Sequence, residues 1–187
     1  PGSRLVIDEG RQRVDIDTDV HHTLYGAVVA SWGLHAALVA DSDTFEYRKF
    51  GLDRFKMAAN ELLNPSDGTP PHEFKGKITL TTSNGPNEAR PQEAVEELEH
   101  MYALATLVPR LEKDFLISPD SVPLDGQMRF IRFGPMSAED AMQLMTLAYQ
   151  GGRHVMEDTV TYADTEQVRI DFQEDEERWR RVCIDGK

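Results

Sequence analysis

The apolar residues of this chain come in many short runs separated by turn residues, and only three stretches show helical spacing. Near the start, Leu5 and Ile7, and then Val14 and Ile16, are expected to share one face on either side of the turn signal Glu9-Gly10, which predicts a β-hairpin. Many short strands with few interposed helices favour a mainly β (α+β) chain. We therefore expect an antiparallel β-sandwich decorated with about three helices.

Several further segments have the composition of strands. The segment 24–39 is rich in Val, Ala and Leu and predicts one or two buried strands, bent near Gly33. The other predicted strands are 75–82, 115–117, 128–133, 155–162, 167–172 and 179–184. Residues 64–72 and 83–90 are polar and rich in Gly and Pro, so we expect loops there.

Three stretches predict helices. The first runs from Phe45 to Leu62, with Gly51 inside it, and Asn64-Pro65 ends it. The second runs from Pro91 to Leu107. The third has the clearest ends, because Ser137 and Asp140 form a capping box and Gly151-Gly152 follow the apolar stripe.

Charge and composition limit the classes of function. The 187 residues correspond to about one domain, and 33 acidic against 20 basic residues give a net charge of −13. This charge argues against nucleic acid as a partner and against long-range attraction to an anionic membrane. The single cysteine, Cys183, excludes an internal disulfide and fits the cytosol. No apolar run reaches the roughly 18 residues that a membrane span requires.

One segment of 25 residues carries a specific pattern. It consists of Ser31-Trp32-Gly33, Asp41, Asp43, Tyr47-Arg48, Gly51 and Arg54-Phe55. This pattern resembles the start of the C-terminal domain of sphingosine kinases and their diacylglycerol- and ceramide-kinase relatives. Shorter matches follow in the same order along the chain, at Val14-Asp15-Ile16, Pro123–Gly126, Gly152-Arg153-His154 and Val182–Gly186.

The resemblance implies a β-sandwich and a role in a lipid kinase. Residues 4–187 would be the lipid-binding C-terminal domain, after a cloning scar at residues 1–3, and the ATP-binding N-terminal domain would be missing. The full-length enzyme would use ATP and Mg²⁺ to phosphorylate a sphingoid base or a diacylglycerol-type lipid. Its partners would be that lipid, the missing domain and, transiently, a membrane surface in the cytoplasm.

The isolated chain is expected to be inactive and to require no cofactor. Asp67-Gly68-Thr69 imitates part of the family's Gly-Gly-Asp-Gly-Thr phosphate loop, but Pro70 and Pro71 follow it. Prolines supply no backbone N–H to a phosphate, so we interpret this stretch as a surface turn.

Three residues are candidates for binding the lipid. By resemblance, Asp41 recognises the headgroup, and a carboxylate there favours an amine-bearing lipid. The alternative for Asp41, and more strongly for Asp43, is a capping role at a helix end. Trp32 is either a core residue or part of the lipid slot.

Three more residues are candidates for binding the nucleotide. By resemblance, Arg48 and Arg54 reach the phosphates, although six residues of helix would separate their directions by roughly 120° unless Gly51 loosens the turn. The alternative is two solvated arginines paired with local carboxylates. Asp185 matches an acidic position near the nucleotide, where Lys187 replaces the family's following Glu.

The sequence offers little for a metal site. By resemblance, Asp125 takes part in a metal site in some bacterial relatives, but a single carboxylate in a Pro-Leu-Asp-Gly turn also fits a plain turn residue. The adjacent His21 and His22 would point to opposite faces of a strand.

Two other functions compete with the lipid kinase. A non-catalytic lipid-binding or regulatory domain could have kept the same fold. An unrelated metal-dependent hydrolase lacks any ligand motif in this sequence.

Overall fold

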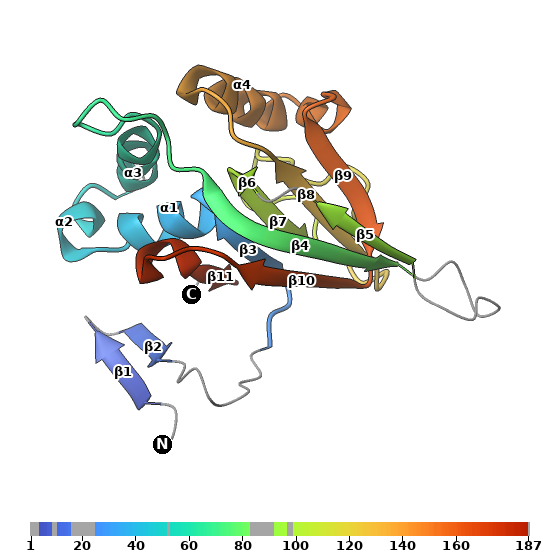
Figure 1. The fold of residues 1–187 in the computed structure, drawn as a ribbon, viewed down its shortest axis with the longest axis horizontal. Helices are drawn as coiled ribbons and strands as arrows, with labels where there is room; N and C mark the ends of the chain where they lie inside the picture. Colours follow the sequence, from blue (N-terminus) through green and yellow to red (C-terminus); the bar gives the residue numbers. More distant parts are fainter. Residues whose placement is uncertain are drawn as a thin grey trace.

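The computed structural model describes residues 4–8, 11–15, 25–51, 53–82, 92–96 and 99–186 (Figure 1). The strands are β1 (Arg4–Asp8), β2 (Arg11–Asp15), β3 (Val29–Gly33), β4 (Phe74–Thr82), β5 (Gln92–Glu96), β6 (Glu99–His100), β7 (Tyr102–Thr106), β8 (Met128–Phe133), β9 (Val160–Thr165), β10 (Gln167–Phe172) and β11 (Val182–Ile184). The helices are α1 (Leu34–Ser42), α2 (Phe45–Arg48), α3 (Asp53–Leu63), α4 (Ala138–Tyr149) and the 3₁₀ turns η1 (Arg153–Met156) and η2 (Glu177–Arg180).

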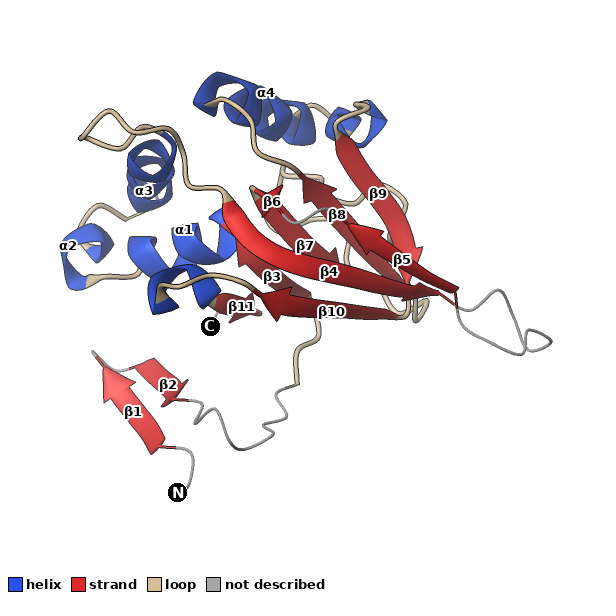
Figure 2. Ribbon diagram, in the orientation of Figure 1, coloured by secondary structure: helices blue, strands red, loops and turns tan. Residues whose placement is uncertain are grey.

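The strands of the described residues form two larger antiparallel sheets. One has the order β11-β3-β7-β8-β9, and the other has the order β10-β4-β5, with β6 also paired to β4. Helices α1, α2 and α3 gather at one end of these sheets, and α4 lies apart from them (Figure 2). The predicted β-sandwich with helices is confirmed.

Trp32 lies in the core between the two sheets and is fully buried. Its ring packs edge-on against Phe74 and Phe172, with centroid distances of 5.8 and 5.4 Å. The strand β4 makes room for it at Gly76, where a Cβ would lie 2.8 Å from Trp32 Cη2. The apolar strand pattern therefore builds a core in which one tryptophan fixes the spacing of the sheets.

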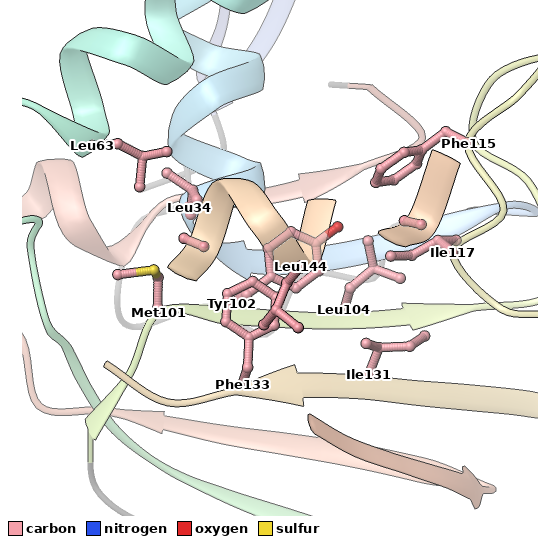
Figure 3. Packing of buried hydrophobic residues seen from close by; sticks show 12 residues of the cluster. Leu34, Leu63, Met101, Tyr102, Leu104, Phe115, Ile117, Ile131, Phe133 and Leu144 are labelled. Atoms are coloured by element: carbon pink, nitrogen blue, oxygen red, sulfur yellow. The ribbon is translucent and has the colours of Figure 1, made fainter. Parts of the chain in front are cut away.

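A second core lies on the other face of the five-stranded sheet, under α4 (Figure 3). Tyr102 stacks on Phe133 with ring centroids 4.8 Å apart, and Leu144 of α4 belongs to the same cluster. The capping box of α4 forms as predicted, because Ser137 Oγ accepts the N–H of Asp140 at 3.1 Å. Gly151 and Gly152, with φ of +82° and +76°, follow the end of the helix.

The N-terminal hairpin is also confirmed. Strands β1 and β2 pair antiparallel, with Leu5 opposite Val14. The predicted turn at Glu9-Gly10 lies outside the described residues, as do the loop 83–90 and residues 1–3.

The helix predicted from Pro91 to Leu107 is wrong, because this stretch contains β5, β6 and β7. Tyr102 and Leu104 join the core under α4, whereas Ala103 and Ala105 join the core between the sheets. A central strand that is buried on both faces shows no alternation of apolar and polar residues. Periodicity alone cannot distinguish its continuous apolar run from the buried side of a helix.

The second half of the segment 24–39 is a helix, not a strand. Strand β3 ends at Gly33, and α1 starts at Leu34. Gly33 has φ +84° and ψ −145°, and the N–H of Leu34 bonds the Met101 carbonyl at 2.8 Å. The bend predicted near Gly33 is therefore present, but the chain continues from it as a helix, which the composition did not indicate.

The single helix predicted from Phe45 to Leu62 is interrupted. Helix α2 ends at Arg48, and α3 begins at Asp53, with Gly51 between them at φ +58°. A left-handed residue cannot continue a right-handed helix, so the chain changes direction here.

Three predicted strands near the C-terminal half are shorter than expected. Leu116 forms only an isolated bridge with Arg110 within the segment 115–117. Strand β9 starts at Val160 after the turn η1, and η2 occupies the first part of the segment 179–184. In the part of the chain that is described, none of the helices has both the length and the apolar character for crossing a membrane.

Candidate functional site

Two carboxylates stand at the C-terminal end of α1. Asp41 lies in its last turn, Asp43 is its C-cap residue, and the last turn contains no basic residue. The C-terminal end of a helix carries partial negative charge, so acidic side chains there need cations from elsewhere. Four arginines supply them, two to each carboxylate.

Asp43 binds the two arginines of the α2–α3 segment. Its Oδ1 and Oδ2 accept hydrogen bonds from Nε and Nη2 of Arg48, at 3.2 and 3.0 Å. Nη1 of Arg54 lies 3.6 Å from Oδ1. The predicted divergence of these arginines does not arise, because the break at Gly51 lets both reach the same carboxylate.

The guanidinium of Arg54 has a further contact and an unused donor. It lies over the ring of Phe55, with Cζ 4.7 Å from the centroid. Its Nε lacks a hydrogen-bond partner within the described part of the chain. The carboxylate of Asp43, in contrast, is almost completely buried.

Asp41 binds two arginines from the end of the chain. Arg178 Nη2 donates to its Oδ2 at 3.1 Å, and Arg181 Nη1 donates to its Oδ1 at 3.0 Å. The sequence analysis missed both arginines, because they lie 137 and 140 residues away from Asp41. The one available signal was the Arg178-Trp179-Arg180-Arg181 run in an acidic chain.

Trp179 fixes the position of η2, which carries Arg178. Its carbonyl accepts the indole N–H of Trp32 at 2.8 Å. Its ring stacks on His72, with centroids 4.0 Å apart and planes at 11°. The Cζ atom of Arg178 lies over the Trp179 ring, 4.4 Å from its centroid. His72 is held in turn by Glu174, at 3.0 Å. Trp32 thus supports the site from the core, through the backbone of η2.

An open hollow of about 580 Å³ borders Arg178 and Trp179. Its lining is mixed: Leu62, Pro70, Pro71 and Trp179 are apolar, and Glu61, Asp67, Glu73, Lys75 and Arg178 are charged. It lies next to the Asp41 group, since Arg178 belongs to both.

The Asp67-Gly68-Thr69 stretch forms one edge of this hollow as a turn. Asp67 Oδ1 accepts hydrogen bonds from the backbone N–H and the hydroxyl of Thr69, at 3.0 and 2.7 Å. These bonds favour the ionised carboxylate and lower the pKa of Asp67. The interpretation as a surface turn agrees with this geometry.

Tyr47 and Glu61 connect α2 to α3. The Tyr47 hydroxyl donates to the carboxylate of Glu61, which also lines the hollow. This hydrogen bond, with smaller contributions from desolvation and from the charges of Glu61 and Asp41, raises the pKa of Tyr47 to about 12. Tyr47 is therefore protonated at neutral pH and holds the two helices together as a donor.

The carboxylate of Asp185 binds three backbone N–H groups. It accepts those of Ala27, Val28 and Val29 at 2.7, 2.9 and 2.8 Å. These bonds tie the end of β11 to the start of β3, which are also paired as strands. Its role toward a nucleotide stays a prediction.

Asp125 lies in an exposed turn and accepts the N–H of Gln127 at 2.8 Å. Among the described residues, no group of three or more His, Cys, Asp or Glu side chains is suited to a metal ion. Mg²⁺ usually takes one or two carboxylates together with waters and phosphates, so the metal role of Asp125 stays a prediction.

The comparisons with known proteins concern the fold. No family profile and no curated protein matches the sequence. Among solved structures, a putative diacylglycerol kinase from Bacillus anthracis str. Sterne matches with a TM-score of 0.52 and 13% identity. This chain has a diacylglycerol-kinase-like fold. The match covers 87% of this chain and 45% of that protein. This chain therefore spans less than half of the length of the diacylglycerol kinase that it matches.

Proposed function

We propose that this chain is the lipid-binding half of an ATP-dependent lipid kinase. The kinase transfers the γ-phosphoryl group of ATP to a hydroxyl of a sphingoid-base or diacylglycerol-type lipid. The diacylglycerol-kinase-like fold supports this proposal. The arrangement of Arg48 and Arg54 around Asp43 is the observation that carries it.

The guanidiniums of Arg48 and Arg54 meet on the single carboxylate of Asp43. The side chains of the two arginines are 30% and 23% exposed, so an anion can reach them. Asp43 holds both guanidiniums in place before a ligand arrives, which reduces the entropy that binding would cost. Fixed guanidiniums suit the phosphate groups of a nucleotide, because phosphoryl transfer depends mainly on positioning and on neutralising charge.

The Asp41 group and the hollow beside Arg178 would hold the lipid headgroup. In the reaction, the lipid hydroxyl oxygen forms a bond to the γ-phosphorus while the bond from phosphorus to the ADP oxygen breaks. The hydroxyl proton passes to a base of the ATP-binding domain. Mg²⁺ bound with ATP would neutralise phosphate charge during transfer.

Helix α2 supports a transient contact with a membrane surface in the cytoplasm. Phe45 and Phe50 are large exposed apolar side chains on and just after this short helix. Lys49 Nζ lies 5.3 Å from the ring of Phe50. Aromatic side chains flanked by a cation are typical of segments that lie in a lipid interface.

The test uses the complete native gene product and labelled ATP. We expect phosphorylation of a sphingoid base or a diacylglycerol, and no transfer by residues 1–187 alone. Replacing Arg48 or Arg54 by Gln should raise KM for ATP roughly tenfold to a hundredfold, the effect of losing one charge-assisted bond. Arg169→Gln, in the exposed pair of β10 with Asp171, is the matched control and should change nothing.

Two results would count against this function. A complete gene product that phosphorylates no lipid would refute the kinase. If it nevertheless binds lipid, the non-catalytic lipid-binding or regulatory domain becomes the better explanation.

A further inference from the structure

The carboxylate of Asp41 is already saturated with cations. Each of its oxygens accepts an N–H from a different guanidinium, Arg178 on Oδ2 and Arg181 on Oδ1. One negative and two positive charges leave this group with one positive charge in excess. A carboxylate in this state attracts a further cation far less than an isolated one would.

The two arginines are held in place by independent contacts. Arg178 lies over the ring of Trp179, whose carbonyl is fixed by the buried indole of Trp32. Arg181 directly precedes β11, which pairs with β3 in the five-stranded sheet. The fold therefore fixes the backbone that presents both arginines to Asp41, while their side chains are 50% and 43% exposed.

We propose that Arg178 and Arg181 determine headgroup specificity, by masking Asp41 so that the site selects an uncharged glycerolipid headgroup over an amine-bearing sphingoid base. This inference rests on the proposed function, because it assumes that the headgroup binds here. It departs from the expectation drawn from Asp41 alone, in which the carboxylate favours an amine.

Hydrogen-bond chemistry supports this choice. A guanidinium offers only donors, and an ammonium group also offers only donors. The hydroxyl and ester oxygens of a glycerolipid are acceptors, so they can take the N–H groups of Arg178 and Arg181 that Asp41 leaves unused. An ammonium would first have to displace a guanidinium and would then lie beside the other one.

The hollow beside Arg178 gives such a headgroup a place. Its walls include apolar residues, Pro70, Pro71 and Leu62, and three acidic ones, Glu61, Asp67 and Glu73. The carboxylate of Glu61 is engaged by the Tyr47 hydroxyl, and that of Asp67 by Thr69. Arg178 is the residue that this hollow shares with the Asp41 group. A headgroup in the hollow would therefore meet the guanidinium of Arg178 before it met the carboxylate.

The experiment compares two short-chain probes that stay monomeric in water, dioctanoylglycerol and a short-chain sphingoid base. Monomeric probes avoid the attraction between this acidic chain and a cationic vesicle. Binding to the 187-residue chain is measured by calorimetry for the wild type, R178Q/R181Q, R178K/R181K, and R178Q/R181Q with D41N. R180Q, on the same 3₁₀ turn, is the matched control.

We expect the wild type and R180Q to bind dioctanoylglycerol about tenfold more tightly than the base. R178Q/R181Q should gain about tenfold in affinity for the base, corresponding to about 1.4 kcal/mol, and adding D41N should remove that gain. R178K/R181K keeps the charge and should show no gain. Circular dichroism of each variant confirms that it is folded.

The outcomes separate this inference from the proposed function. Tighter binding of the base than of dioctanoylglycerol by the wild type would overturn the masking of Asp41. So would an R178Q/R181Q variant that is folded and binds dioctanoylglycerol without gaining affinity for the base. If neither probe binds to any variant, the lipid-binding function itself is wrong.

Discussion

Gly33 joins β3 to α1, and replacing it by Ala should destabilise the whole domain. With φ +84° and ψ −145°, Gly33 lies close to a backbone region that only glycine adopts readily. An added Cβ would lie 2.6 Å from the carbonyl oxygen of Met101. That carbonyl cannot retreat freely, because it accepts the first N–H of α1, from Leu34, at 2.8 Å.

The expected loss follows from these two effects. A side chain in such a strained conformation costs about 1–3 kcal/mol. Forcing an extra methyl into a packed site costs about 1–3 kcal/mol more. Together they give roughly 2–6 kcal/mol, a large part of the ~5–15 kcal/mol that stabilises a typical domain.

Urea unfolding followed by circular dichroism measures the free energy of unfolding of Gly33→Ala. Gly126→Ala is the matched control, because Gly126 also has a positive φ, +78°, but nothing within 4 Å of its added Cβ. We expect the control to lose about 1 kcal/mol. Equal losses in the two variants would refute the reasoning, since they would mean that the contact with Met101 costs nothing.

The remaining predictions concern pH and the end of β11. Burial lowers the pKa of His35 from 6.5 to about 4, so the unfolded chain binds protons more readily between these values. The stability that depends on neutral His35 is fully present above pH 6.5, and the free energy of unfolding falls by up to about 3 kcal/mol as the pH drops toward 4. Chemical denaturation at several pH values measures this dependence on pH. The variant His35→Gln should show a smaller dependence. Asp185→Asn should cost about 1–3 kcal/mol, because an amide cannot accept all three N–H groups of residues 27–29. Thermal unfolding and hydrogen exchange at those residues measure the loss.

Each of these predictions has its own control. An unchanged pH slope in His35→Gln would show that the buried imidazole does not carry the effect. For Asp185, the comparison is Asp125→Asn, whose carboxylate accepts one N–H in an exposed turn. If hydrogen exchange at residues 27–29 is the same in both variants, the hydrogen bonds from these residues to Asp185 do not stabilise the start of β3.

Local signals made some elements predictable from the sequence. The ends of α4 follow from Ser137, Asp140 and the Gly151-Gly152 pair, which act within one or two turns of the chain. The hairpin of β1 and β2 and the stop of α3 before Asn64-Pro65 are of the same kind. Such features depend on neighbours in sequence, so no knowledge of the tertiary fold is needed.

Other elements depend on contacts that a sequence pattern does not contain. Strand β7 is buried on both faces, and only the presence of a sheet on one side and α4 on the other makes that pattern a strand. The site shows the same division. Asp43, Arg48 and Arg54 lie within one predictable segment, whereas the arginines on Asp41 are brought there by the pairing of β11 with β3.

The pairing of Asp41 with Arg178 also sets an order for assembly during synthesis. Asp41 leaves the ribosome 137 residues before Arg178, and Ala27 precedes Asp185 by 158 residues. Local structure such as α1 can form early in a nascent chain, but contacts this distant must wait for the last strand. Until residue 181 has been translated, the nascent domain carries an unmasked carboxylate at the end of α1. On the proposed function, headgroup discrimination is therefore acquired only after both arginines have left the ribosome.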